Sequence, residues 1–263
     1  MMEIREIMER FYADSDEDSR LAGRCGNVEF VTTIRYIEKY LLQGMRVLEI
    51  GAGTGRYSHY LARQGYDVDA VELTAHNIEI FRRNTLPGER VAITQGTATD
   101  LSAFATGTYD ITLVLGPMYH LFTEKDKLTA LAEAIRVTKK GGVIFAAYCM
   151  SDPSIVQYGF AKGNIHALIE RKMVDTENFR AYSSPNEIFE LHRKRDIDLL
   201  RAHFDVEQLH FVAADGFANH IRQALTEMDE ETYALYMKYH LATCENQELV
   251  GWSNHTLDIF RKN

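Results

Sequence analysis

Three glycines at every second position, Gly51, Gly53 and Gly55, form the pattern with the clearest chemical meaning in this sequence. They follow the apolar run RVLEI and precede a segment with helical periodicity, which predicts a tight turn between a strand and a helix. Glycines at such a turn let a ligand approach the backbone N–H groups at the start of the helix. Turns of this kind also occur without a ligand, so the glycines alone leave that alternative open.

Two glutamates near the turn indicate what kind of ligand it would bind. Glu49 stands two residues before the first glycine, where a carboxylate suits a ligand with a cationic group better than a pyrophosphate. Glu72 ends the next predicted strand, a position from which a carboxylate can accept both ribose hydroxyls in α/β folds that bind nucleosides. Arg56 occupies the place of the third glycine in the dinucleotide pattern, which argues against a nicotinamide or flavin oxidoreductase. Together, the two glutamates favour a ligand site over a plain turn.

The segments that must position these residues alternate β-rich runs with helical ones. Strands are predicted at 46–50, 67–72, 90–94, 109–115, 141–150, 204–216 and 255–262. Near-continuous apolar strands joined by helices are typical of a parallel sheet that is covered on both faces. The fold prediction is therefore α/β, with a doubly wound, mostly parallel, seven-stranded Rossmann-like sheet.

The whole chain is interpreted as one domain, because no linker rich in Pro, Gly or Ser divides it. Its predicted parts are a helical N-terminal lid, a cofactor-binding core, and a substrate-side helical insertion followed by the C-terminal strands (1–45, 46–150 and 151–263). Helices are expected in the insertion at 154–173 and 184–203. The helix before the fifth strand is expected to include Lys139 and Lys140 in its last turn and to end at Gly141.

Five segments carry a resemblance to a known family: VLEIGAGTGRYS (47–58), VELT (71–74), QGTATDL (95–101), YDITLVLGPMYHL (109–121) and LAEAIRVTKKGGVIF (131–145). They resemble the class I S-adenosylmethionine-dependent methyltransferases. The resemblance implies S-adenosyl-L-methionine as the cofactor, held by Glu49, Gly51, Ala52, Gly53, Gly55, Glu72, Leu73, Thr99, Asp100, Leu101, Leu115 and Gly116. It assigns the ribose to Glu72 and the adenine to Leu73, Asp100 and Leu101. The residues themselves leave open that Asp100 only caps a short helix.

The carboxyl end of the fourth strand is the expected position of the methyl acceptor, because open parallel sheets bind ligands at these ends. The catalytic candidates there are His120, as a general base of near-neutral pKa, and Tyr119, packed over the cofactor. Each has a purely structural alternative. Gly116 replaces the leading polar residue of the DNA and glutamine methyltransferase motif, so the run resembles a bacterial small-molecule group with the sequence G-P-x-Y-H-L.

Composition and charge restrict the partners. The chain has 38 acidic and 29 basic residues and a net charge of −9, which disfavours nucleic acid. No apolar run approaches the roughly 18 residues of a membrane helix. Cys25, Cys149 and Cys244 fit neither a disulfide framework nor a thiolate zinc site, so we expect a cytoplasmic protein. No metal site is expected from the histidines.

The leading function is methyl transfer to an oxygen, nitrogen or sulfur atom of a small molecule. The alternatives are an RNA or protein methyltransferase, for which HRKR (192–195) is the only hint of a docking surface, and a non-catalytic cofactor-binding protein. A homodimer is left open. Arg20, Arg24 and Arg35 either line the ligand pocket or pair with the acidic run at 14–18.

Overall fold

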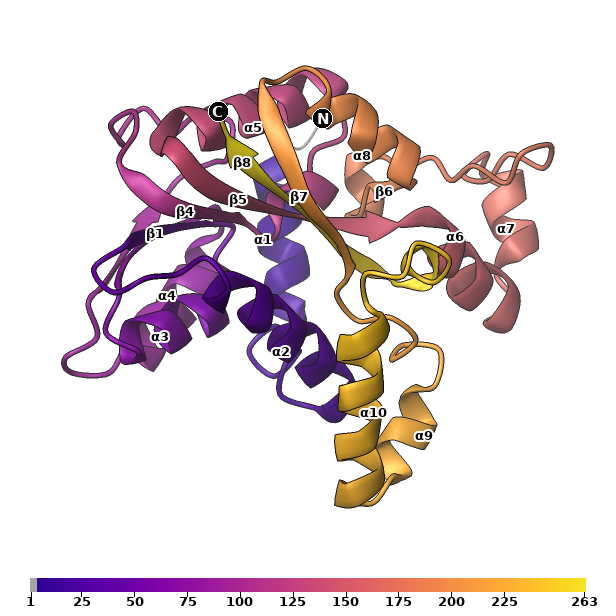
Figure 1. Ribbon diagram of the computed structural model, residues 1–263. Coiled ribbons are helices and arrows are strands. Elements are labelled where there is room, and N and C mark those ends of the chain that lie inside the picture. Colours follow the sequence, from indigo (N-terminus) through magenta and orange to yellow (C-terminus); the bar gives the residue numbers. More distant parts are fainter. Residues whose placement is uncertain (1–3) are drawn as a thin grey trace.

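The apolar runs of the core are buried on both sides, as a sheet covered on two faces requires. Leu48, Ile111, Leu113 and Phe145 are each at most 1% exposed. The computed structural model describes residues 4–263 (Figure 1). Its strands are β1 (Arg46–Ile50), β2 (Asp67–Glu72), β3 (Val91–Gln95), β4 (Tyr109–Val114), β5 (Thr138–Met150), β6 (Leu191–His192), β7 (Val206–Ala213) and β8 (His255–Lys262).

Helices cover both faces of this sheet and extend beyond it. They are α1 (Ile4–Asp14), α2 (Arg24–Glu38), α3 (Arg56–Arg63), α4 (Ala75–Asn84), α5 (Glu124–Val137), α6 (Ser151–Ser154), α7 (Ile165–Glu170), α8 (Lys194–Arg201), α9 (Arg222–Glu227) and α10 (Glu230–Thr243). Short helical turns are η1 (Pro117–Tyr119), the π-helical η2 (Ile155–Ala161), η3 (Pro185–Glu187) and η4 (Val250–Trp252). Among the described residues, no helix is both long and apolar enough to cross a membrane.

The strand order is β3-β2-β1-β4-β5-β8-β7, and the first five strands run parallel. β8 is antiparallel to both of its neighbours. The expected α/β Rossmann-like sheet is therefore present, with eight strands in the described chain where seven were expected. The extra strand, β6, pairs only Leu191 and His192 with the end of β5, and two residues are too short for a recognisable sequence pattern.

The chain leaves β1 between β2 on one side and β4 on the other, so the strand order reverses at this point. The register pairs Ile50 with Val71 of β2 and with Val114 of β4, which brings the carboxyl ends of the three strands together. Open α/β sheets bind their ligands in the crevice at such a reversal. This edge of the sheet positions the site described below.

The expected end of the helix before the fifth strand is wrong. α5 ends at Val137, and Lys139 and Lys140 belong to β5. Between Thr138 and Val143 the register against β4 shifts, and Gly141, with φ of 78°, lies in this bulge. The lysine ammonium of Lys139 binds the Asp110 carboxylate across the two strands, 2.8 Å away.

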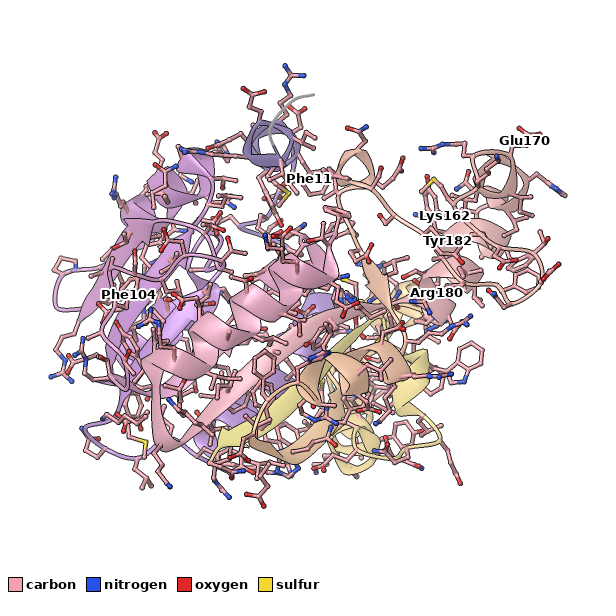
Figure 2. All side chains as sticks on the ribbon, turned by 90° about the horizontal axis from the view of Figure 1, so that it is seen from above. Phe11, Phe104, Lys162, Glu170, Arg180 and Tyr182 are labelled. Carbon is pink, nitrogen blue, oxygen red and sulfur yellow. The ribbon has the colours of Figure 1, made fainter. Side chains whose placement is uncertain are left out.

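The two helices expected in the insertion are also only partly correct. The segment 154–173 is interrupted after η2 by a turn, and α7 covers only part of its second half. In the segment 184–203 the helix begins only at Lys194, because Ile188 has a left-handed φ of 68° and His192 joins the sheet. The insertion projects from the sheet (Figure 1), and Figure 2 shows Lys162, Glu170 and Tyr182 together at the opposite end of the molecule from Phe104.

Candidate active site

A cavity of about 330 Å³ lies at the carboxyl ends of β1, β2 and β4, and we call it the first cavity. Eight of the residues expected at the cofactor line it: Glu49, Gly51, Ala52, Gly53, Glu72, Leu73, Leu115 and Gly116. Both catalytic candidates, Tyr119 and His120, line it as well. Ile4, Met8 and Tyr12 of α1 cover it from the N-terminal side.

The glycine turn has the backbone geometry that its sequence predicts. Gly51 and Gly53 have positive φ angles of 76° and 54°, a region that residues with a side chain rarely adopt. A Cβ atom on Gly51 would come within 2.6 Å of Pro117, whereas one on Gly53 would meet only Glu17, at 3.8 Å. A side chain on Gly53 would therefore occupy the cavity rather than collide with the protein.

Gly55, in contrast, lies outside the first cavity and has a structural role. It precedes the first residue of α3 with φ of 93°. A Cβ atom there would lie 2.5 Å from Phe81 and 2.6 Å from His59. Its place in the motif reflects the close approach of α3 to α4, so we remove it from the expected cofactor set.

The Glu72 carboxylate holds the loops that form the first cavity. Its Oε2 accepts the Gly53 N–H at 2.9 Å, and its Oε1 accepts the backbone N–H and the hydroxyl of Thr74 at 3.0 and 2.8 Å. The side chain thus joins the end of β2 to the glycine turn after β1. It also lines the cavity, where a carboxylate oxygen has room for further hydrogen bonds.

Glu49 is the most deeply buried acid that lines the first cavity, with 1% of its surface exposed. It accepts a hydrogen bond from the Ser58 hydroxyl. Burial raises the pKa of Glu49 to about 8. A positively charged ligand group beside it would favour the carboxylate form, as the sequence suggested for a cationic ligand.

The loop after β3 reaches the first cavity through residues that lie closer to β3 than the expected ones. Thr97 and Ala98 line the cavity, whereas Thr99, Asp100 and Leu101 do not. Asp100 is exposed, and its carboxylate accepts the Ser102 N–H at 3.0 Å. Hydrogen bonding with the Ser102 side chain, and then with its backbone, lowers the pKa of Asp100. Leu101 is fully buried in the core. The structure does not bring these three residues to the first cavity, and the contacts of Asp100 favour a role in the local turn.

His120 has two hydrogen-bond partners that fix its tautomer. Its Nδ1 lies 2.9 Å from the Ile188 carbonyl, which can only accept, so Nδ1 carries the proton and Nε2 accepts from the Tyr12 hydroxyl at 2.9 Å. Burial lowers the pKa of His120 to about 4. The expectation of a base with a near-neutral pKa is therefore wrong, and the contacts favour the structural alternative, in which His120 anchors α1. The Tyr119 hydroxyl donates to the Leu115 carbonyl at 2.7 Å.

A larger cavity of about 1100 Å³, the second cavity, adjoins the first. The two share Tyr12, Glu17, Arg20 and Tyr119 as wall residues. Aromatic side chains form much of the remaining wall of the second cavity: Phe11, Tyr158, Tyr182 and Phe189. The insertion after β5 contributes Tyr158 and Tyr182, so it borders a space next to the cofactor region.

The amino-acid sequence matches the model of a methyltransferase domain over residues 47–142. A ubiquinone biosynthesis O-methyltransferase of Vibrio parahaemolyticus is 24% identical over 59% of this chain and 65% of its own length. An S-adenosyl-L-methionine-dependent Diels-Alderase of Talaromyces variabilis is 32% identical over 38% of this chain and 34% of its own length. The chain thus spans less than two thirds of either relative.

The fold is shared with methyltransferases of known structure. The crystal structure of a SAM-dependent methyltransferase from Methanosarcina mazei matches 86% of this chain and 96% of its own, with a TM-score of 0.57 and 18% identity. Residues 47–142 match a methyltransferase domain, and the chain has the fold of a SAM-dependent methyltransferase of known structure. The first cavity fits the cofactor of this domain type, because Gly53 leaves room that a side chain would fill and the buried Glu49 suits a cationic group.

The arginines before the methyltransferase domain differ in their roles. Arg20 lines both cavities and pairs with Glu17 at 2.8 Å and Glu29 at 2.9 Å. Arg24 lines the second cavity and pairs with Glu230 of α10, while Arg35 is exposed and lines neither cavity. Only Arg20 therefore pairs with the acidic run, and burial raises the pKa of its partner there, Glu17.

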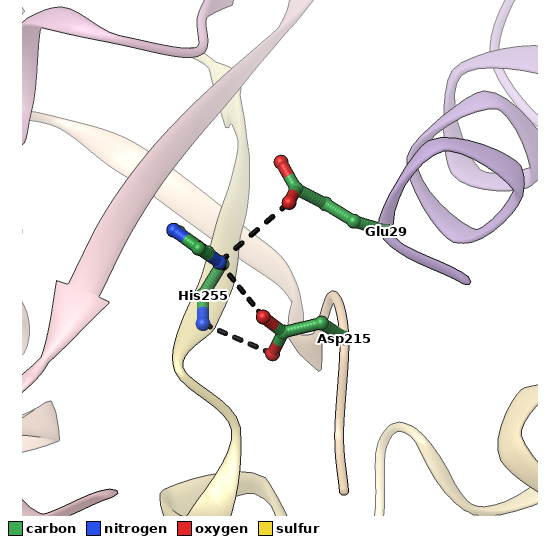
Figure 3. Close-up of side chains that lie close together, drawn as sticks. All are labelled: Glu29, Asp215 and His255. Carbon is green, nitrogen blue, oxygen red and sulfur yellow. Dashed lines mark hydrogen bonds and ion pairs between the residues drawn. The ribbon is translucent and has the colours of Figure 1, made fainter. Parts of the chain in front are cut away.

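A cluster of Glu29, Asp215 and His255 lines the second cavity, and sequence reasoning missed it (Figure 3). The His255 Nδ1 atom lies 2.7 Å from Asp215 Oδ2 and 3.6 Å from Glu29 Oε2. A separation of 2.7 Å is that of a charge-assisted hydrogen bond, which places a proton between the two atoms. The only local signal was a histidine at the start of the last predicted strand.

Proposed function

We propose that this protein transfers a methyl group from S-adenosylmethionine to a small molecule that occupies the second cavity. The observation that carries the proposal is the pair of adjoining cavities with Tyr12, Glu17, Arg20 and Tyr119 in their common wall. One cavity is formed by the methyltransferase motifs, and the other offers aromatic walls suited to a small organic molecule. The name of the Vibrio relative, an O-methyltransferase of ubiquinone biosynthesis, agrees with a small acceptor.

In this proposal the glycine turn holds the methionine end of the cofactor, Glu72 holds its ribose, and Glu49 favours a cationic group of the same molecule. S-adenosylmethionine supplies a methyl group on a positively charged sulfur, which becomes a neutral thioether when the methyl group leaves. The chain's own residues position the acceptor and exclude water. Such positioning accounts for a large part of the rate in displacement reactions.

The contacts of the basic run argue against an RNA or protein acceptor. His192 is buried in β6, Arg193 pairs with Asp152 at 2.9 Å, and Lys194 pairs with Asp198 at 2.7 Å. These side chains do not form one basic docking face. A non-catalytic cofactor-binding protein would be expected to lack an accessible second cavity, so the cavity of about 1100 Å³ argues against that alternative too.

Two further expectations remain predictions. The three cysteines are free and buried, which is compatible with the cytoplasmic location inferred from their spacing. The oligomeric state is open, and sedimentation of the purified protein would decide between a monomer and a homodimer.

The test is to incubate the protein with S-adenosylmethionine and a panel of small phenols, amines and thiols, and to measure the demethylated cofactor by mass spectrometry. We expect product with at least one small acceptor, which gains the mass of one methylene group. The Gly53→Val variant should give none. Product only with RNA or protein substrates would contradict the proposal, as would a cofactor that binds but is never consumed.

A further inference from the structure

We propose that His255 is the general base of this methyltransferase and that the second cavity takes an aromatic hydroxyl compound, whose oxygen gives its proton to the His255 Nε2 atom. This proposal rests on the proposed function. It names the acceptor atom and the chemical class that the preceding arguments leave open.

Asp215 fixes the orientation of the His255 ring. Its carboxylate accepts four hydrogen bonds: from the Ser253 hydroxyl at 2.6 Å, the His255 backbone N–H at 3.1 Å, the Asn219 amide at 2.7 Å and His255 Nδ1 at 2.7 Å. With both oxygens satisfied, the carboxylate is held rigidly. The ring must then carry its Nδ1 proton toward Asp215, which leaves Nε2 as the atom that can exchange a proton with a ligand.

The Nε2 atom of His255 has no hydrogen-bond partner among residues 4–263. It is also not one of the fully buried polar atoms without a partner, so part of its surface is accessible. The ring lines the second cavity, and 28% of its side-chain surface is accessible. Figure 3 shows this nitrogen on the side of the ring away from Glu29 and Asp215. Its position and its missing partner point to a ligand in the cavity.

The His255 ring is also close to the first cavity. Its centroid lies 6.4 Å from that of Tyr119, a residue that lines both cavities. A ligand that contacts Nε2 and packs against Tyr119 would therefore lie next to the cofactor region. Aromatic rings favour offset or edge-on contacts with other rings, so the walls of the second cavity suit an aromatic acceptor.

The charges around His255 favour a hydroxyl over an amine. Arg20 binds Oε2 of Glu29, and both oxygens of Asp215 are hydrogen-bonded, so the negative charge of the two carboxylates is already partly neutralised. A ring that is stabilised as a cation by these carboxylates would repel an ammonium group as well. An oxygen that becomes negative as it loses its proton is attracted to the same ring.

The groups that face the ring come from four elements: Glu29 and Cys25 of α2, Cys149 of β5, Tyr119 of η1 and Asp215 after β7. Burial disfavours the charged ring, but Glu29, Cys149 and Asp215 outweigh it and raise the pKa of His255 well above its usual value. Arg20 offsets part of the Glu29 charge. The ring therefore binds a proton tightly, and it takes up the proton of the acceptor only after it has released its own to solvent.

The proton transfer breaks the O–H bond of the acceptor and forms an N–H bond at Nε2. The electron pair of the broken bond stays on the oxygen, which becomes the nucleophile. The Nδ1 proton remains on the ring, so His255 becomes a cation beside the Asp215 carboxylate, and it later returns the extra proton to solvent. The same ion pair forms when an ionised phenol binds the protonated ring.

The test uses 4-nitrophenol, whose ionised form is yellow, with the full-length protein saturated with the demethylated cofactor. Wild type should increase the ionised-to-neutral ratio of the bound probe at least about tenfold over that of the free probe, which is one pKa unit. The His255→Gln variant should bind the probe without this increase, and Asp215→Asn should give an intermediate one. His203→Gln, an exposed histidine outside the second cavity, should match wild type.

Equal ionisation of the bound probe in wild type and His255→Gln would overturn the proposal, and so would a wild-type protein that does not bind the probe. An increase that appears only with added Zn²⁺ and disappears with a chelator would assign the cluster to a metal instead. Calorimetric binding of the demethylated cofactor is measured in the same samples. If that binding is absent, the proposed function fails, whatever the probe shows.

Discussion

Glu49 is a buried carboxyl group whose protonation should be visible in the stability of the ligand-free protein. Burial raises its pKa from 4.5 to about 8. Between these pH values the folded protein keeps a proton that the unfolded chain has released. The contribution of Glu49 to stability is therefore full below about pH 4.5 and is lost as pH rises through about 8.

We therefore expect the Glu49→Gln variant to lose less of its unfolding free energy than wild type between pH 5 and pH 8. Urea denaturation at several pH values in this range, without cofactor, measures the two slopes. Glu6→Gln, a change of an exposed acid on α1, should keep the wild-type slope. Equal slopes for wild type and Glu49→Gln would show that Glu49 is ionised in the folded protein.

Gly53 should be needed for the cofactor and much less for the fold. A valine there would enter the first cavity, since only Glu17 lies within 4 Å of the position that its Cβ atom would take. We expect Gly53→Val to abolish calorimetric binding of S-adenosylmethionine and to cost about 1–2 kcal/mol of stability for the positive φ. Gly107→Val has a comparable φ of 65° in open space and serves as the matched control, with normal binding. Loss of binding in both variants would point to a general effect of strain.

His255 should stabilise the folded protein most strongly at low pH. Its folded pKa is raised well above the usual value, so its contribution is present below about pH 6.5 and is lost as pH rises through the raised pKa. Replacing His255 with Gln should therefore destabilise the protein more at pH 6 than at pH 9, by about 1–3 kcal/mol for a hydrogen bond to a charged group. Urea denaturation at the two pH values measures the difference. A larger loss at pH 9 would contradict the assigned charge.

Sequence reasoning predicted the residues of the first cavity far better than those of the second. Gly51, Gly53 and Glu72 belong to two neighbouring strand ends, so their spacing along the chain reflects their spacing in space. Glu29, Asp215 and His255 come together only through the packing of α2 against the last strands. No local pattern connects residues 29, 215 and 255, and the low pKa of His120 arises from burial that its sequence neighbours do not reveal.

At the level of elements, α1 is held over the first cavity by two polar contacts. Glu9 accepts the backbone N–H of Ala75 at 2.7 Å and so caps α4 from outside, while Tyr12 binds His120. Glu9→Ala should weaken this docking by about 0.5–2 kcal/mol, the range for losing a helix cap. Hydrogen exchange in α1 should then be faster than in wild type and in Glu6→Ala, with the sheet unchanged. Unchanged exchange in α1 would mean that apolar contacts alone hold it.

The core strands could be predicted closely because their signal is local. β1, β2 and β8 begin and end at the predicted residues, and β4 differs by one residue. The structure of the segment 184–203 could not be predicted closely, because the pairing of β6 with the distant β5 competes with the helical pattern there. The helical periodicity also did not indicate the left-handed backbone conformation of Ile188. Tertiary pairing therefore decided the regions where the sequence was ambiguous.

At the level of the whole molecule, the two cavities are formed by different regions of the chain. The motifs of residues 47–142 form most of the first cavity, while the N-terminal helices, the insertion and the start of β8 surround the second. An acidic chain with a net charge of −9 still places Arg20 and His255 next to the cavities. This arrangement fits a domain with a fixed cofactor and an acceptor set by the surrounding elements.

Calorimetric titration of the wild-type protein with S-adenosylmethionine shows whether the first cavity binds this cofactor. We expect one site per chain for S-adenosylmethionine and for its demethylated product, no binding of NADH, and loss of both cofactor signals in Gly53→Val. Ligands that bind only the folded state should also raise the melting temperature. Binding of NADH, or the absence of any heat with S-adenosylmethionine, would show that the first cavity is not a site for S-adenosylmethionine.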